Sequence, residues 1–248
     1  MRVWLLSDTH CQHDKLLIPD GIDMVVHAGD ATNSRSPVVN NNEMLKFLEW
    51  YEALNIQYKV YVPGNHDTSI EHAYISKDMF LSRGIHLLID RYLFIRSEDH
   101  ANMKMWYHED ARYIIIYGSP YTPRFGTGWA YNEDRESMHR HYANLDFGSI
   151  DLFVTHGPPH GILDKTRGGG VYRNGINYEE VGISSVGCSA LRAAVRETMP
   201  TTHVFGHIHN EPGIVNSSLT YKESTQYVNA SVVDIYHNLI NNGKIIDI

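Results

Sequence analysis

The sequence predicts an α/β fold, with mixed β-sheets covered by helices in a single domain over residues 1–248. Three observations support this prediction. Short apolar runs typical of strands recur along the chain, several of them are separated by segments with helical periodicity, and the second half is richer in strand-like runs. A chain of 248 residues is also long enough to bury the core of one large α/β domain.

Short apolar runs predict the strands. The clearest of them are Val3–Leu6, Met24–His27, Lys59–Val62, Ile114–Tyr117, Leu152–Thr155 and His203–Phe205. Two further runs, Tyr227–Val228 and Lys244–Ile248, follow near the C-terminus, where Asn and Gly mark turns. Because these later strands are joined by short connections without helical patterns, we expect mixed sheets and not a purely parallel sheet.

Helical periodicity appears between several of these runs. Residues 41–54 carry apolar side chains at positions i, i+3, i+4 and i+7, which predicts an amphipathic helix. A second helix is predicted over 185–199, and it ends before Pro200, which cannot continue it. Weaker patterns predict helices at about 70–82 and 133–143.

The stretch from residue 160 to residue 184 has no secondary-structure period and is rich in Gly and polar residues. Such a composition is typical of a mobile loop. Long loops in compact domains also serve as lids over binding sites. The sequence alone does not choose between a plain loop and a lid.

Composition limits the classes of function. The net charge is −8, from 21 basic and 29 acidic residues, which predicts no stable complex with nucleic acid, since such complexes need clustered Lys and Arg. A small phosphate substrate stays compatible with this charge, because bound metal ions can supply local positive charge. No apolar run approaches the ~20 residues of a membrane span, so we expect no membrane association.

The two cysteines, Cys11 and Cys188, are too few for a disulfide framework and fit a reducing compartment. The N-terminal stretch MRVWLLSDTH resembles a first strand more than a signal peptide, because its apolar run is short. We therefore expect a cytoplasmic protein. The sequence does not indicate its oligomeric state.

The stretch VPGNHD at residues 62–67 directly follows a predicted strand. We expect Gly64 to form a sharp turn there, because glycine can adopt a positive φ. Asn65, His66 and Asp67 then offer an amide oxygen, an imidazole and a carboxylate, which are groups that bind metals and transfer protons. One short motif of this kind is not specific by itself.

Five of the predicted strands end in residues of this chemistry, in the runs VWLLSDTH, MVVHAGD, VYVPGNHD, LFVTHGPP and HVFGHIH. Loops at the carboxyl ends of strands converge on one crevice in α/β sheets, so the five motifs can meet. Asp8 and His10 share the i, i+2 spacing of His207 and His209, which in extended backbone turns both side chains to one face. Both pairs could therefore bind a single metal ion.

Two further histidines, His27 and His203, lie within apolar runs. We expect them in the core or behind the metal ligands, and not among the ligands.

The motifs DTH, GD, GNHD, THGPP and GHIH, which extend in this order from residue 8 to residue 209, resemble those of the calcineurin-like metallophosphoesterase superfamily. The stretches GSPYTPRFGTGW, THGPPHGILD and YVNAS resemble, more narrowly, the branch called metallophosphoesterase-domain-containing proteins. The resemblance implies the metallophosphoesterase fold, a four-layer α/β/β/α sandwich of two mixed β-sheets flanked by helices. The chain departs from the pattern in loops, chiefly 164–180 and 214–225, which leaves the substrate less determined than the chemistry.

The resemblance also implies a site for two metal ions. One ion would be bound by Asp8, His10, Asp30 and His209, and the other by Asp30, Asn65, His156 and His207, with Asp30 bridging them. Imidazole and carboxylate ligands without thiolate suit Mn, Fe, Co, Ni or Zn better than Mg or Ca, and we favour Mn²⁺. Because Asn65 is neutral, the site would keep a positive charge that attracts a phosphoester anion.

Two such ions, about 3.5–4 Å apart, would lower the pKa of a bridging water, and the resulting hydroxide would attack phosphorus. The leaving oxygen then needs a proton. His66 is the candidate general acid, since its neighbours in GNHD place it at the site without making it a ligand. We expect Asp67 to support the His66 imidazole.

The candidate substrate contacts, which follow a predicted strand and its GSP motif, are Tyr121, Arg124, Trp129 and Asn132. Their rings, cation and amide are suited to stacking on a base and binding its edge, although the aromatic side chains are equally suited to packing in the core. With the resemblance, this favours a phosphodiesterase that acts on cyclic or other small nucleotides.

Other functions stay open at this point. A phosphomonoesterase, either a nucleotidase or a phosphoprotein phosphatase, would use the same metals. A catalytically silent scaffold would have lost metal ligands, and every ligand position is filled in this chain. A DNA exonuclease is disfavoured by the acidic charge.

Overall fold

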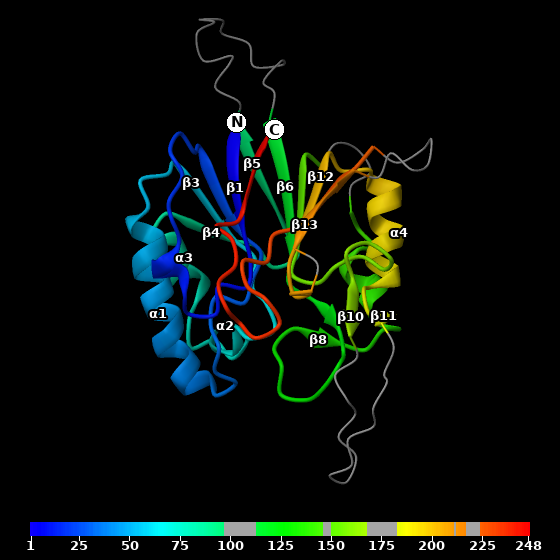
Figure 1. The fold of residues 1–248 in the computed structure, drawn as a ribbon, viewed down its shortest axis with the longest axis horizontal. Coiled ribbons are helices and arrows are strands. Elements are labelled where there is room, and N and C mark those ends of the chain that lie inside the picture. Colours follow the sequence, from blue (N-terminus) through cyan, green and yellow to red (C-terminus); the bar gives the residue numbers. More distant parts are fainter. Residues whose placement is uncertain (97–112, 146–149, 168–182, 211, 217–223) are drawn as a thin grey trace, which may run out of the picture.

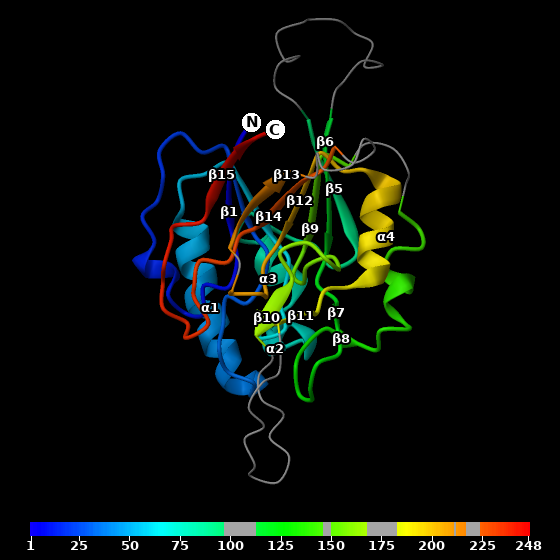
Figure 2. The same cartoon turned by 45° about the vertical axis from the view of Figure 1, so that its right-hand side comes forward.

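The computed structural model describes residues 1–96, 113–145, 150–167, 183–210, 212–216 and 224–248. Two β-sheets face each other in the middle of the molecule, and helices cover their outer faces (Figure 1). The two termini lie side by side, and the N-terminal ammonium group donates a hydrogen bond to the carbonyl of Ile248 at 2.7 Å (Figure 2). This arrangement agrees with the predicted α/β/β/α sandwich.

The first sheet has five strands in the order β15-β1-β2-β3-β4. Its parallel strands are β1 (Arg2–Leu6), β2 (Met24–His27), β3 (Tyr58–Tyr61) and β4 (Ile85–Leu87). The last strand of the chain, β15 (Lys244–Asp247), pairs antiparallel with β1 at the edge. The carboxyl ends of β1, β2 and β3 consequently point the same way and carry the DTH, GD and GNHD motifs.

The second sheet has six strands in the order β13-β14-β12-β9-β6-β5. Its parallel interior consists of β6 (Tyr113–Ser119), β9 (Leu152–Thr155), β12 (Thr202–Phe205) and β14 (Gln226–Asn229). The antiparallel edge strands are β5 (Arg91–Arg96) and β13 (Gly213–Asn216). The sheets are therefore mixed, as predicted, and the THGPP and GHIH motifs follow the ends of β9 and β12.

Two small sheets complete the strands. β7 (Thr122–Pro123) pairs parallel with β8 (Asn132–Glu133), and β10 (Lys165–Arg167) pairs antiparallel with β11 (Ile183–Ser185). The stretch 160–184 thus contains strand residues at both of its ends, which its lack of periodicity did not predict. The expectation of a lid falls mainly on residues 168–182, which lie outside the described residues.

The long predicted helices form, with shifted ends. Helix α1 (Pro37–Ala53) begins earlier than the pattern indicated, at a proline whose fixed φ suits the first turn. Helix α4 (Ser189–Thr198) ends at Met199, which adopts a left-handed φ of 45° before Pro200.

The weaker helix predictions were only partly correct. The segment 70–82 holds two short helices, α2 (Thr68–Glu71) and α3 (Lys77–Leu81), and Ala73 between them has a φ of 58°, which breaks the helical path. Around 133–143 there is only a 3₁₀ turn, η3 (Met138–His141), and η1 (His13–Lys15) was not predicted. Among the described residues, no helix has both the length and the apolarity needed to cross a membrane.

Strand β1 shows how the layers pack. Val3 and Leu5 belong to the apolar cluster between the two sheets, whereas Trp4 and Leu6 face the opposite way and pack with Phe47 of α1. Because side chains alternate along a strand and both faces of β1 are covered, the run is apolar at every position. A third cluster joins the second sheet to α4, so the metal-ligand motifs are carried by strands buried on both faces.

Candidate metal centre

The motifs that end β1, β2, β9 and β12 meet in space. His156 Nε2 lies 3.3 Å from Asp30 Oδ2, and His209 Nε2 lies 3.2 Å from Asp8 Oδ1. The backbone N–H of His207 also donates to the Asp8 carboxylate. Side chains from both sheets therefore line one site, as expected from strands that end at the same edge.

One group of candidate ligands surrounds the end of β9. The ligand atoms of Asp30, His156 and His207 all lie within 4.8 Å of one another. Asn65 Oδ1 lies 2.8 Å from His156 Nε2. Because His156 Nδ1 donates to the carbonyl of Ala28 at 2.8 Å, its Nε2 is the nitrogen left to bind a cation beside Asp30 and Asn65.

A second group surrounds the end of β1. The ligand atoms of His10, Asp30 and His66 lie within 4.8 Å of one another, and so do those of His10, His209 and His237. His10 Nδ1 donates to the carbonyl of Thr32, while its buried Nε2 has no hydrogen-bond partner in the part of the chain that the structure describes. A buried polar atom without a partner is uncommon, and a cation at this position would give it one.

These residues fit a pair of divalent cations. Asp8 and Asp30 are both buried, with exposed fractions of 0% and 2%, and a buried carboxylate needs a cation or a set of donors. Asp30 takes part in both groups, as a bridging ligand must. The donor set of imidazole, carboxylate and amide groups suits a transition-metal ion.

Two histidines beside the buried carboxylates have raised pKa values, so they bind protons more readily. Burial by itself would lower the pKa of His156, but the neighbouring carboxylates outweigh it and raise that pKa to about 9. The pKa of His209 is also raised, since Asp8 outweighs the effect of burial. Burial instead lowers the pKa of His10 to about 4 and that of His207 to about 3. Bound cations would therefore displace protons from His156 and His209.

Gly64 is required for a reason other than the predicted one. Its φ is not positive; the positive φ of this region, 98°, belongs to Gly29. A Cβ on Gly64 would instead lie 2.3 Å from Asp30 Oδ1 and 2.7 Å from His156 Cε1. The glycine thus allows the backbone after β3 to approach the ligands closely.

Several candidate ligands have unusual backbone angles. Asp8, His10, Asp30 and His207 have φ values of 57°, 43°, 59° and 66°. Such values are uncommon for residues other than glycine and concentrate at functional sites. The expectation that extended backbone places the i, i+2 pairs on one face was therefore wrong, although the side chains do meet.

His66 is held beside the ligands by its own backbone and ring. Its N–H donates to Asp30 Oδ1 at 2.7 Å, and its Nδ1 lies 2.9 Å from the carbonyl oxygen of Asn33. A carbonyl only accepts hydrogen bonds, so Nδ1 carries a proton. The other nitrogen, Nε2, lies 4.0 Å from Asp30 Oδ2 and faces the site.

Asp67 does not support this imidazole, contrary to the sequence prediction. Its carboxylate accepts hydrogen bonds from the backbone N–H groups of Asp30 and Gly64, and from the hydroxyls of Tyr61 and Thr32. Burial and the nearby Asp30 carboxylate raise its pKa to about 6. Asp67 therefore ties the GNHD turn to the end of β2, and the carbonyl of Asn33 orients the histidine.

An aromatic pair borders the site. The ring of Trp129, a predicted substrate contact, lies 4.6 Å from that of His66 between centroids. Phe125 lies 5.7 Å from Trp129 and 5.0 Å from His207. Sequence reasoning did not select Phe125, although it belongs to the same GSPYTPRFGTGW stretch.

The side chains of the other predicted substrate contacts interact with protein groups away from the candidate ligands. Tyr121 stacks on His141 at 3.6 Å and packs against two apolar clusters. Arg124 forms an exposed ion pair with Asp134, which follows β8, and the amide of Asn132 donates to the Thr122 hydroxyl and to the carbonyl of Ala130. Of the four, only Trp129 is brought to a candidate ligand.

Two residues at the site carried no sequence motif. His237 stacks on His10 with centroids 4.1 Å apart and an angle of 14° between the rings, and its carbonyl accepts a hydrogen bond from Gln12. Arg35 places its guanidinium carbon 3.7 Å from the centroid of Trp129. Both lie in loops without a recognisable pattern, so the sequence offered no signal for them.

His27 and His203 lie behind the ligands, and this prediction is confirmed. Both are fully buried. His27 Nε2 is 3.0 Å from Thr9 Oγ1, and His203 Nε2 is 2.9 Å from Thr155 Oγ1. Each histidine therefore holds a threonine that is adjacent in sequence to a candidate ligand.

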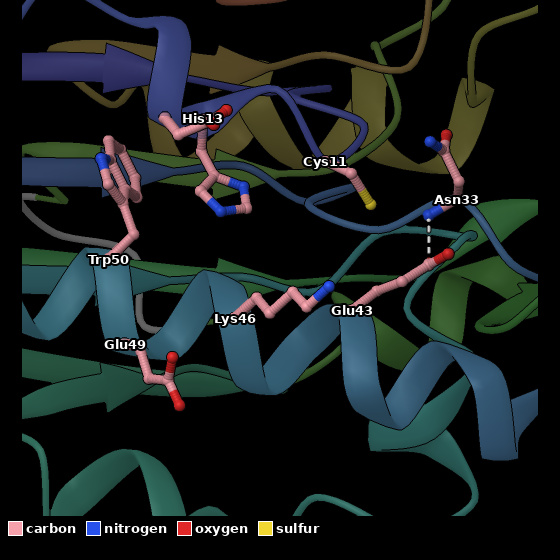
Figure 3. Close-up of a pocket in the computed structure, with 8 residues that line it drawn as sticks. Cys11, His13, Asn33, Glu43, Lys46, Glu49 and Trp50 are labelled. Atoms are coloured by element: carbon pink, nitrogen blue, oxygen red, sulfur yellow. Dashed lines mark hydrogen bonds between the residues drawn. The ribbon is translucent and has the colours of Figure 1, made fainter.

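A separate cavity of about 650 Å³ adjoins the site between α1 and the chain after β1 (Figure 3). It is lined by Cys11, His13, Asp14, Asn33, Glu43, Lys46, Glu49 and Trp50. The N–H of Asn33 donates to Glu43 at 2.8 Å within it. None of the candidate metal ligands lines this cavity, but Asn33 connects it to His66.

Solved structures share this fold. Phosphopantetheinyl hydrolase from Mycobacterium tuberculosis has a TM-score of 0.54 and 15% sequence identity, with 95% of this chain and 90% of that chain covered. TT1561 of Thermus thermophilus has a TM-score of 0.53 at 14% identity, with 93% and 88% covered. At these identities the likeness concerns the fold alone.

Sequence comparison identifies the family. Residues 1–211 match the family described as calcineurin-like phosphoesterase. Metallophosphoesterase domain-containing protein 1 of Homo sapiens is 31% identical over 257 residues, which cover 98% of this chain and 69% of the relative. Its counterpart in Mus musculus has the same values. The chain therefore belongs to the calcineurin-like phosphoesterase family, whose members hydrolyse phosphoesters with divalent metal ions at a dinuclear site.

Proposed function

We propose that this chain is a phosphodiesterase that hydrolyses small nucleotides, cyclic or linear, with two divalent ions for which Mn²⁺ is the favoured metal. Its candidate ligands are Asp8, His10, Asp30 and His209 for one ion, and Asp30, Asn65, His156 and His207 for the other. The single observation that supports this proposal best is the position of Asp30 in both groups of converging ligand atoms. When bound, such ions lower the pKa of water and neutralise charge on the phosphate oxygens.

His66 is the proposed general acid. Because its Nδ1 proton is held by the carbonyl of Asn33, Nε2 is the atom that delivers a proton to the leaving oxygen. The side chain is 15% exposed, so this nitrogen can exchange protons with solvent between turnovers. The leaving group consequently lies on the His66 side of the site.

A leaving alcohol that carries an aromatic group, as in a nucleotide diester, is supported by what surrounds His66. The rings of Trp129 and Phe125 lie next to this histidine and to His207, and they form an aromatic border against which a nucleobase or another aromatic group could pack. The phosphoryl group would be bound at the metal centre that the candidate ligands hold, whereas the rings would contact the alcohol that leaves. A phosphomonoester of a small alcohol has no group that reaches this surface.

The remaining expectations concern the cellular setting. We place the protein in the cytoplasm, because Cys11 and Cys188 are both free thiols in the structure. The net charge of −8 supports a small substrate in preference to a nucleic-acid duplex.

A comparison of model substrates tests this function. Protein supplied with Mn²⁺ should hydrolyse bis-p-nitrophenyl phosphate faster than p-nitrophenyl phosphate, and should also act on 3′,5′- or 2′,3′-cyclic nucleotides. The variant Asp30→Asn serves as the blank, and activity that persists in it indicates a contaminant. A clear preference for the monoester would replace the diesterase by a nucleotidase or phosphoprotein phosphatase.

A further inference from the structure

Arg35 contacts the tryptophan that borders the site. It lies in the loop between β2 and α1, and its guanidinium carbon is 3.7 Å from the centroid of Trp129. The same tryptophan ring contacts His66 at 4.6 Å. Among the described residues, Arg35 has no hydrogen bond and no ion pair.

A guanidinium that stacks on an indole keeps its N–H groups available. The guanidinium carbon of Arg35 lies over the Trp129 ring, and a cation–π contact of this kind uses none of the N–H donors in a hydrogen bond. These donors form a planar fork that matches the oxygens of a phosphate or carboxylate. The contact with Trp129 thus holds the guanidinium of Arg35 in place, and its N–H donors can bind an anion.

Two other arginines differ from Arg35 in this respect. Arg124 is bound to Asp134 at 2.7 Å, and Arg135 donates to the backbone carbonyls of Gly187 and Val186. Both have protein partners that account for their positions. Of these three, only Arg35 contacts the tryptophan ring that also contacts His66.

Arg35 is also not needed to hold its own loop. The carboxylate of Glu43 accepts hydrogen bonds from the N–H groups of Asn33 and Ser34, at 2.8 and 2.9 Å. The carbonyl of Asn33 is fixed in turn by His66. Removing the Arg35 side chain should therefore leave the loop and the general acid in place.

We propose that Arg35, stacked on Trp129, forms a subsite for a second anionic group that is carried by the leaving part of the substrate. The inference rests on the proposed function, in which His66 protonates the leaving oxygen. The charge of the phosphate under attack would be neutralised at the metal centre. The charge of Arg35 is therefore available for a second anionic group on the substrate. The substrate class is a phosphodiester whose leaving alcohol bears its own phosphate, such as a linear dinucleotide with a terminal phosphate.

A set of dinucleotides tests this subsite. Three forms of adenylyl-adenosine are compared. The first has no terminal phosphate, the second has a phosphate at its 5′ end, and the third has a phosphate at its 3′ end. The products show which nucleoside leaves. For the dinucleotide whose leaving nucleoside carries the phosphate, Arg35→Ala should lower kcat/KM by about 10- to 100-fold, as expected for the loss of a charged hydrogen bond. For the unphosphorylated dinucleotide, kcat/KM should change by less than about twofold.

Two further variants complete the experiment. Arg135→Ala removes an arginine whose N–H groups already donate to the carbonyls of Gly187 and Val186, and it should leave the rates for all three dinucleotides unchanged. Arg35→Lys keeps the charge without the planar fork and should restore part of the selectivity. If Arg35→Ala lowers the rates for all three dinucleotides alike, or for none, the subsite is refuted while the proposed function stands. If the unmodified protein hydrolyses none of the three but does hydrolyse bis-p-nitrophenyl phosphate or a cyclic nucleotide, the subsite is refuted while the proposed function stands. If it hydrolyses none of these diesters, the proposed function fails and the subsite fails with it.

Discussion

The backbone N–H of Asp30 donates a hydrogen bond to the carboxylate of Asp67 at 3.0 Å. This contact joins the motif that ends β2 to the motif that ends β3. The same carboxylate accepts from the N–H of Gly64 and from the hydroxyl of Tyr61, at 2.6 and 2.7 Å. The proposed bridging ligand is therefore positioned by the carboxylate of Asp67, which is not among the candidate ligands.

We expect Asp67→Asn to destabilise the fold. An amide at this position would place N–H groups where buried donors now converge, and an unsatisfied buried donor costs about 1–3 kcal/mol. Tyr61→Phe removes only one of these donors and should cost about 1 kcal/mol. Urea unfolding of the metal-free proteins measures both differences. A variant Asp67→Asn with the stability of the parent would show that this carboxylate does not hold the turn.

The roles proposed for Asp30 and His66 separate in two variants. Asp30→Asn should lose bound metal, because this residue belongs to both groups of ligands. His66→Ala should keep its metal and lose turnover by the ~10²–10⁴-fold typical of general acids. Metal content by mass spectrometry and kcat for a diester check the two predictions. Equal loss of metal in both variants would remove the distinction between ligand and acid.

Metal affinity should depend on pH in a defined direction. In the metal-free protein the pKa of His156 is raised to about 9, so its imidazolium is the prevailing form at neutral pH. A cation must displace that proton, and affinity should therefore rise as pH rises toward about 9 and level off above it. The raised pKa of His209 acts in the same direction. Titration with Mn²⁺ between pH 6 and pH 9, together with proton release in weak buffer, measures this effect; an affinity that is constant with pH would contradict it.

His237 should support metal binding through its ring face. It stacks on His10 at 4.1 Å in a nearly parallel arrangement, and aromatic pairs contribute about 0.5–1.5 kcal/mol. His237→Ala should therefore weaken binding at the His10 side by up to about tenfold, while His237→Phe should keep most of the affinity. The dissociation constants for Mn²⁺ of the two variants and of the parent protein test this prediction. Equal weakening in both variants would mean that a nitrogen of His237 binds the metal directly.

The sequence predicted the framework of the site because its signals are local. Apolar runs that end in Asp, His and Asn specify both a strand and the chemistry at its end, and the convergence of such ends is a general property of α/β sheets. The same logic placed His27 and His203 behind the ligands, since both lie within apolar runs.

What the sequence did not predict depends on contacts between distant segments. The carboxylate of Asp67 binds groups that are brought to it by β2 and β3, and no local pattern distinguishes this from a contact with His66. Arg35 and His237 reach the site from loops without motifs. The left-handed backbone at Asp8 and the break at Ala73 are likewise imposed by the surrounding fold, which overrides local preference.

Anomalous X-ray diffraction from crystals soaked in Mn²⁺ tests the central claim most directly. The account predicts two anomalous peaks with the carboxylate of Asp30 between them, one contacted by His10 and His209 and the other by Asn65 and His156. A single peak, or peaks that these side chains do not contact, would contradict it.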